Sequence, residues 1–156
     1  MRAGALPAGF SACRAVEAAI SSFAMNDEGV VRILRESIPD LVAVYRFGST
    51  VRGDMRASSD VDLAVLASAA LEPVRRFELQ ERIAALLGKD VDLLDLRSAS
   101  TVMRLQVVSR GIAIDGLRAR ERQAFEGEVL SAYARLNEER REVLERVRRE
   151  KSVHGG

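Results

Sequence analysis

The sequence predicts an α+β (mixed α/β) fold, in which a small mixed β-sheet is flanked by helices and followed by a long C-terminal helix. Two observations support this prediction. Short apolar runs of strand length alternate along the chain with segments whose apolar residues recur at helical spacing. The last part of the chain is dense in Glu and Arg and keeps helical spacing between its apolar residues. With 156 residues and a hydrophobic fraction of 47%, the chain is large enough for one compact core.

The first predicted elements are a helix and a strand that leads into a loop. Asn26 can cap a short helix, which Pro39 ends. The run at 41–47 predicts a strand because it is apolar and contains β-branched and aromatic residues. A Gly-Ser pair follows directly, and a polar loop continues over 50–59. The loop therefore leaves the end of a strand.

A second strand is predicted at 60–67. Its alternation places apolar side chains on one face and two carboxylates on the other, because successive residues of a strand point to opposite sides. The apolar face holds Val61, Leu63 and Val65, and the polar face holds Asp60 and Asp62.

The remaining elements alternate in the same way. A helix is expected at about 72–87, with a proline in its first turn and a glycine as its stop. A third strand follows at 90–95, a helix at about 99–109 and a short edge strand at 112–114. One long helix is predicted from 119 to 151. This order of elements is typical of a sheet covered by helices.

The long helix carries a stripe of apolar residues among dense charge. The stripe consists of Phe125, Val129, Tyr133, Leu136, Val143 and Val147. We expect its first part, up to Leu136, to cover the sheet. The segment beyond Asn137 is expected to protrude, and either to face a partner or to be partly frayed.

The chain is predicted to have four parts. Residues 1–25 form a poorly ordered N-terminal extension, and Met25 is an alternative start of translation. The folded domain covers 26–118, the C-terminal helix 119–151 and a short tail 152–156.

Charge and cysteine usage exclude several classes of protein. Lys and Arg number 24 and Asp and Glu 23, so no basic excess favours a direct nucleic-acid partner. Cys13 is the single cysteine, which excludes a disulfide framework or a cysteine zinc site and fits a cytoplasmic protein. No apolar run is long enough to cross a membrane.

The Gly48-Ser49 pair at the end of a strand can form a phosphate cradle. Gly48 allows the backbone to approach an anion closely, and the Ser49 hydroxyl adds a hydrogen-bond donor. Three arginines close in sequence are candidates for contact with a triphosphate: Arg46, Arg52 and Arg56.

Two carboxylates on one strand face predict a metal site. Asp60 and Asp62 would repel each other, and a hard divalent cation such as Mg²⁺ removes that conflict. On the third strand, Asp92 is central and faces away from the apolar side, so we choose it as a third metal ligand or as general base. Asp90 is the reserve, and Asp95 has the opposite parity. A phosphate cradle beside such carboxylates predicts phosphoryl or nucleotidyl transfer.

These residues also carry a resemblance. Gly48-Ser49, ten intervening residues and Asp60-Val61-Asp62 resemble the signature of the DNA polymerase β-type nucleotidyltransferase superfamily. The likeness covers roughly 26–147, which would make 26–118 a nucleotidyltransferase domain. In length and layout the chain is most similar to the minimal nucleotidyltransferases (MNT) that serve as MntA-type antitoxins of HEPN–MNT toxin–antitoxin pairs.

The resemblance implies transfer of AMP from ATP to a tyrosine of a HEPN-domain RNase toxin, which silences the toxin. By the same match, Gly48 and Ser49 would hold the nucleotide phosphates, Asp60 and Asp62 would bind Mg²⁺, and Asp92 would supply the third carboxylate. Thr50 replaces the basic residue that often follows Gly-Ser in this family, although Arg52 is retained. This departure puts one phosphate contact in doubt.

Two alternative functions remain open at this stage. The chain could neutralise a toxin by stoichiometric contact, without essential catalysis. It could also be a nucleotidyltransferase for a small molecule such as an aminoglycoside, although it has no second domain to enclose such a substrate. The intact set of Ser49, Asp60, Asp62 and Asp92 favours an enzyme over a pure binder.

Overall fold

The computed structural model describes residues 27–48, 51, 60–115 and 118–153 of the chain. Residues 27–37 are helical. They are followed in chain order by β1 (Leu41–Phe47), β2 (Val61–Ala67), α2 (Pro73–Leu87), β3 (Val91–Asp95), α3 (Thr101–Arg110), β4 (Ile112–Ala113) and α4 (Ala119–Val153). This architecture confirms the predicted fold class. The N-terminal extension predicted at 1–25 lies outside the described residues.

The four strands form one mixed sheet in the order β3-β2-β1-β4. β1 pairs antiparallel with β2 on one side and with β4 on the other. β2 and β3 are parallel, and α2 makes the crossover that a parallel pair requires. The first residues of β2 and β3 therefore lie at the same edge of the sheet.

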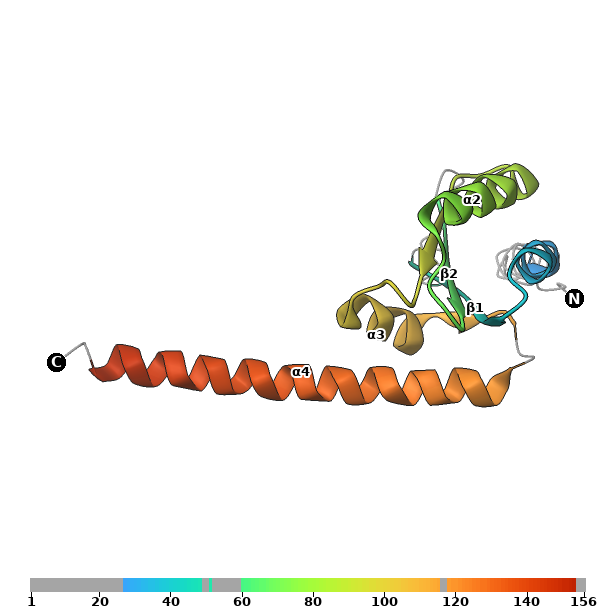
Figure 1. The fold of residues 1–156 in the computed structure, drawn as a ribbon. Coiled ribbons are helices and arrows are strands. Elements are labelled where there is room, and N and C mark those ends of the chain that lie inside the picture. Colours follow the sequence, from blue (N-terminus) through green and yellow to red (C-terminus); the bar gives the residue numbers. More distant parts are fainter. Residues whose placement is uncertain (1–26, 49–50, 52–59, 116–117, 154–156) are drawn as a thin grey trace, which may run out of the picture.

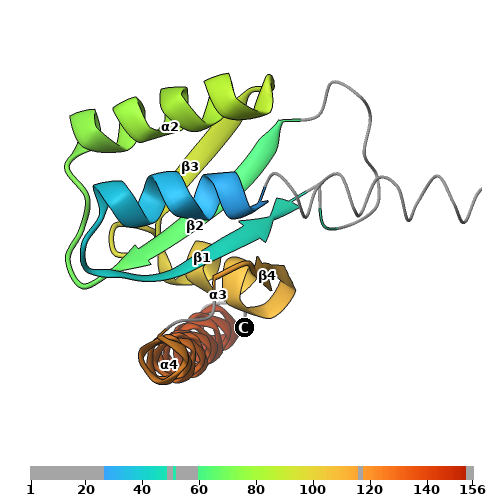
Figure 2. The ribbon, with the colours of Figure 1, turned by 90° about the vertical axis from the view of Figure 1, so that its right-hand side faces the viewer.

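Helices cover both faces of this sheet (Figure 2). The helix at 27–37 and α2 lie against one face, where Leu34, Leu63 and Ile83 are fully buried. α3 and α4 lie against the other face, where Ala64, Leu66 and related side chains are equally buried. The two apolar clusters on opposite faces explain why β1 and β2 are apolar at nearly every position.

The ends of the helices follow local signals in the sequence. α2 starts at Pro73 and ends at Gly88, which has φ 62° and donates its N–H to the carbonyl of Ala84. α3 starts two residues later than predicted because the Ser100 side chain accepts a hydrogen bond from the N–H of Met103 and caps the helix.

α4 divides into a buried part and a protruding part. Phe125 and Val129 are 5% and 3% exposed, whereas Leu136 and Val143 are 40% and 56% exposed. Figure 1 shows the C-terminal half of α4 extending past α3 and the sheet. α4 therefore protrudes as predicted, but the exposed part begins earlier, because Leu136, which was expected to cover the sheet, is already exposed. The helix also continues to Val153 instead of 151, since the sequence has no glycine or proline between Gly127 and Gly155.

No helix in the described ranges is long and apolar enough to cross a membrane.

A buried polar contact attaches α4 to the sheet. Tyr45 on β1 is 1% exposed, and its hydroxyl donates to Glu126 Oε1 at 2.9 Å. Arg122 donates to the same oxygen at 3.0 Å. Burial and the Glu126 carboxylate raise the pKa of Tyr45. Tyr45 therefore has a packing role.

Replacing Tyr45 with phenylalanine should lower the free energy of unfolding by about 1–2 kcal/mol, because a hydrogen bond to a charged acceptor is lost. The folded-state pKa of Tyr45 is raised, so its contribution is complete below about pH 10, where the unfolded phenol is neutral, and decreases as the pH rises further. Urea unfolding at about pH 8 and about pH 11 should show this alkaline loss in the wild type and a smaller one in Tyr45→Phe.

Tyr133→Phe is the matched control, since Tyr133 lies on α4 and is only half-buried. It should keep the alkaline loss of the wild type. An equal loss in Tyr45→Phe would show that the Tyr45 contact does not cause it.

Candidate active site

The register of β2 and β3 brings two of the predicted carboxylates together. Asp62 on β2 is the direct partner of Asp92 on β3 in the parallel pair. Adjacent strands lie about 4.8 Å apart, and paired residues point to the same face of the sheet. Asp62 is half-buried and Asp92 is exposed. The two side chains thus lie next to each other at an open end of the sheet.

The position of this pair follows from how α3 and α4 cover their face. Two residues beyond Asp62 on the same face, Ala64 is fully buried, and so is Leu66. At Asp62 the covering helices no longer exclude solvent, so a carboxylate can be accommodated there. Two neighbouring carboxylates repel each other, and a divalent cation between them would offset that repulsion.

Asp60 lies just before the first residue of β2 and is exposed. Among the described residues, no group of three or more His, Cys, Asp or Glu side chains is arranged to hold a metal ion. The sheet ladder therefore positions Asp62 and Asp92, whereas Asp60 stands outside the ladder.

Gly48 lies directly against the Asp62 carboxylate. It follows Phe47, the antiparallel partner of Asp62, and has φ 75°. A Cβ atom built on Gly48 would lie 1.9 Å from Asp62 Oδ2 and 2.7 Å from its Cγ. Only glycine fits this close approach and this left-handed backbone. The predicted nucleotide-binding residues Ser49 and Arg52 lie outside the described residues, as does Arg56.

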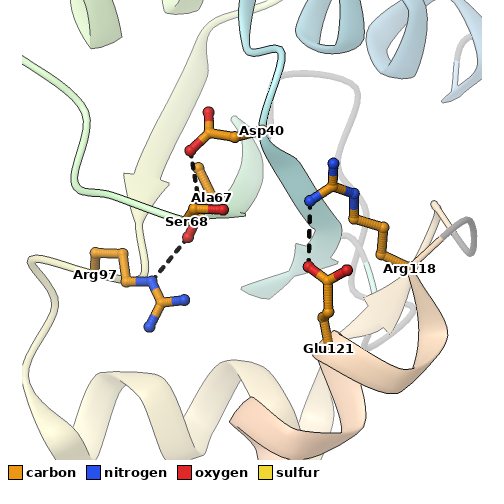
Figure 3. Close-up of polar contacts among 6 residues, drawn as sticks. All are labelled: Asp40, Ala67, Ser68, Arg97, Arg118 and Glu121. Carbon is orange, nitrogen blue, oxygen red and sulfur yellow. Dashed lines mark hydrogen bonds and ion pairs between the residues drawn. The ribbon is translucent and has the colours of Figure 1, made fainter.

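At the C-terminal end of β2, polar contacts attach the strand to neighbouring loops (Figure 3). The N–H of Ser68 donates to Asp40 Oδ2 at 3.1 Å, and Arg97 Nε donates to the carbonyl of Ala67 at 2.8 Å. At the start of α4, Arg118 directly precedes the helix and pairs with Glu121 of its first turn at 3.2 Å. Asp40 and Arg97 thus bind backbone groups at the end of β2, whereas Arg118 and Glu121 form an exposed pair.

Asp95 has a structural role, in line with its parity. It is 2% exposed, and its carboxylate accepts hydrogen bonds from the N–H of Leu71 at 3.0 Å and of Arg97 at 2.9 Å. Asp95 therefore ties the segment before α2 to the end of β3. The reserve candidate Asp90 is exposed and precedes β3.

Asp95→Ala should lower the free energy of unfolding by about 2–4 kcal/mol, because it leaves two buried N–H groups without their acceptor. Asp92→Ala, at an exposed position three residues earlier, should change it by less than about 0.5 kcal/mol. Urea unfolding of both variants measures the difference. Equal losses would contradict this division of roles.

Arg46, one of the three candidates for contact with a triphosphate, does not lie with the carboxylates. It points to the face covered by the helix at 27–37, where its guanidinium pairs with Asp27 at 3.3 Å. Burial raises the pKa of Asp27 and Arg46 partly offsets this. Alternation along β1 is the reason, since Tyr45 and Phe47 face the side of Asp62 and Arg46 faces the other.

A groove of about 710 Å³ lies beside Arg46, between the helix at 27–37 and β4. The sheet separates it from Asp62 and Asp92. On the side of the carboxylates, a small cavity of about 20 Å³ is lined by Phe47, Gly48, Gln106 and Arg110. Sequence reasoning did not single out Gln106 or Arg110, because the pairing of β1 with β4 brings them to Gly48 from far along the chain.

Comparison with known proteins gives the family that the Gly48-Ser49 and Asp60-Val61-Asp62 motifs resemble. Residues 28–116 match the family described as Polymerase beta, Nucleotidyltransferase. The chain is 39% identical, over 79% of its length and 88% of the relative, to the protein adenylyltransferase MntA of Shewanella oneidensis.

Two solved structures of toxin–antitoxin complexes point to the same family. A toxin–antitoxin crystal structure with AMP-PNP matches with a TM-score of 0.71 and 39% identity, over 78% of this chain and 98% of the other. A tri-AMPylated Shewanella oneidensis HEPN toxin in complex with its MNT antitoxin matches with a TM-score of 0.66 and 37% identity, over 79% and 96% of the two chains. These matches confirm the resemblance and the fold that the motif implied.

Proposed function

Because this chain belongs to the polymerase β-type nucleotidyltransferase family, as a minimal nucleotidyltransferase similar to MntA, we propose that it is an antitoxin that transfers AMP from ATP to a tyrosine of a HEPN-domain toxin. The observation that carries this proposal is the pairing of Asp62 with Asp92 directly beside Gly48. A carboxylate pair next to a glycine that admits close backbone approach is suited to a metal-bound nucleotide.

The two carboxylates fit Mg²⁺, since both are oxygen ligands and both lie at the open end of the sheet. We propose Asp62 and Asp92 as metal ligands, with Asp60 joining them when nucleotide is present. Bound there, Mg²⁺ would polarise the α-phosphate of ATP and offset the charge of the departing pyrophosphate.

The protein side chains have distinct roles in this proposal. Gly48 and Ser49 hold phosphate oxygens, and Arg52 adds a positive charge. Asp62 is half-buried against Gly48, so it belongs to the nucleotide side. Asp92 is the more exposed of the pair and faces the acceptor, where it can take the proton of the tyrosine hydroxyl.

A macromolecular acceptor suits the shape of the site. Among the described residues, Gly48 borders a cavity of only about 20 Å³ and Asp92 is exposed, so the described part of the site is open on the acceptor side. A tyrosine on a protein surface needs no enclosure, because the partner brings its own surface. The proposal places the chain in the cytoplasm, where ATP and Mg²⁺ are available, and includes no nucleic-acid partner.

The test is incubation of the purified chain with ATP, Mg²⁺ and its candidate toxin, a HEPN-domain protein, followed by mass measurement of both proteins. We expect the toxin mass to rise by one or more AMP units. Tyrosine-to-phenylalanine variants of the toxin identify the acceptor. The absence of AMP on both proteins would overturn the proposal.

A further inference from the structure

The edge strand β4 brings the end of α3 to the candidate active site. Arg46 on β1 is the antiparallel partner of Ile112 on β4. Arg110, the last residue of α3, lies two residues before Ile112 and lines the same small cavity as Gly48. Across this end of the sheet the order is therefore Asp92, Asp62, Gly48 and Arg110.

Close packing fixes this arrangement. Gly111 donates its N–H to the carbonyl of Val107 at 2.7 Å. A Cβ atom on Gly111 would lie 2.5 Å from that oxygen and 3.3 Å from the carbonyl oxygen of Arg46. A side chain at residue 111 would thus overlap the last turn of α3 and crowd the backbone of β1. This contact holds the backbone at the end of α3, and with it the start of the Arg110 side chain, next to β1.

The space between Gly48 and Arg110 has the size and the chemistry of an anion contact. The cavity of about 20 Å³ accommodates a single oxygen-sized group and excludes a nucleotide base. Gln106, one helical turn before Arg110, lines the same cavity and adds an amide donor. Among the described residues, no carboxylate pairs with Arg110, whereas Arg104 on the same helix donates to the carbonyl of Arg97.

We propose that Arg110, assisted by Gln106, binds the terminal phosphates of ATP, on the side of Gly48 opposite the carboxylates. This inference rests on the proposed function. If the α-phosphate binds at Asp62 and Asp92, as the proposed function requires, the order of these groups along the sheet end directs the remaining phosphates past Gly48 to Arg110.

In the transfer step, the acceptor oxygen forms a bond to the α-phosphorus and its proton goes to Asp92. The bond from the α-phosphorus to the bridging oxygen breaks, and pyrophosphate leaves with the electron pair. The Arg110 guanidinium stabilises the negative charge that develops on this leaving group.

Calorimetric titration with AMP-PNP and with AMP, in the presence of Mg²⁺, tests this assignment. Arg110→Gln should weaken AMP-PNP binding about tenfold or more and leave AMP binding unchanged, because one charge-assisted contact to the terminal phosphates is lost. Arg110→Lys should restore part of the affinity. Arg141→Gln, at an exposed position on the protruding part of α4, is the matched control and should bind both nucleotides like the wild type.

A second variant tests the cavity without removing the arginine. Gln106→Glu places a negative charge beside Arg110 and should also weaken AMP-PNP more than AMP. If Arg110 only stabilised the C-terminal end of α3, its replacement would lower the melting temperature and leave nucleotide affinity unchanged.

The outcomes separate this inference from the proposed function. A wild-type chain that neither binds AMP-PNP nor transfers AMP would refute the proposed function. A wild-type chain that does both, with an Arg110→Gln variant of equal AMP-PNP affinity or with equal losses for AMP and AMP-PNP, would overturn the role of Arg110 alone.

Discussion

Asp62→Ala should lower the rate of AMP transfer by about a thousandfold or more and leave the chain folded. Asp62 pairs with Asp92 across the β2–β3 ladder and contacts Gly48, so its removal takes away both a metal ligand and one wall of the nucleotide site. Removing one of two adjacent negative charges also relieves repulsion in the metal-free chain. Single-turnover transfer to the toxin, followed by mass measurement, gives the rate.

The same variant separates catalysis from stoichiometric inhibition. Mg²⁺ with AMP-PNP should raise the melting temperature of the wild type and not that of Asp62→Ala, since ligands stabilise only the fold that binds them. Glu81→Ala, at an exposed position on α2, is the control and should behave like the wild type. Full neutralisation of the toxin by Asp62→Ala, without transfer, would establish the stoichiometric alternative.

Gly48→Ala should lower AMP transfer by about a hundredfold, because the new methyl group would overlap the Asp62 carboxylate. The built Cβ lies 1.9 Å from Asp62 Oδ2, so either the carboxylate or the strand end must move. Displacements of this size at a reacting centre reduce rates by about this factor. The positive φ of 75° adds about 1 kcal/mol of backbone strain.

Substitutions at two other glycines separate the effect of the overlap with Asp62 from the effect of the positive φ. Gly88 also has a positive φ, of 62°, but a Cβ there meets nothing within 4 Å. Gly88→Ala should therefore lose about 1 kcal/mol of stability and keep its activity. Gly127, on α4, has open space at Cβ, and Gly127→Ala should gain about 0.5–1 kcal/mol. Normal transfer by Gly48→Ala would contradict the packing of Gly48 against Asp62.

Local patterns predicted most of the fold. The strand at 41–47 coincides with β1, because its apolar and aromatic residues run up to a glycine that ends them. Alternation along β3 predicted that Asp92 and Asp95 point to opposite faces of the sheet. In the structure Asp95 is buried and accepts hydrogen bonds from two backbone N–H groups. Alternation succeeds in such cases because strand geometry leaves a side chain only two directions.

Long-range pairing accounts for what the sequence did not reveal. Arg46 was considered for the site because it is close to Gly48 in sequence, but alternation sends it to Asp27 on the opposite face. Arg110 reaches Gly48 only through the pairing of β1 with β4, between segments more than sixty residues apart. No local pattern encodes such a register.

The central claim is that the Asp62–Asp92 pair beside Gly48 catalyses transfer of the nucleoside monophosphate itself. The most direct measurement follows radioactive phosphorus supplied in either the α or the γ position of ATP, with the wild type and Asp92→Asn compared on the same toxin. The α label should appear on a toxin tyrosine, the γ label should leave as pyrophosphate, and Asp92→Asn should transfer neither. A γ label on the toxin, or undiminished α labelling by Asp92→Asn, would contradict the claim.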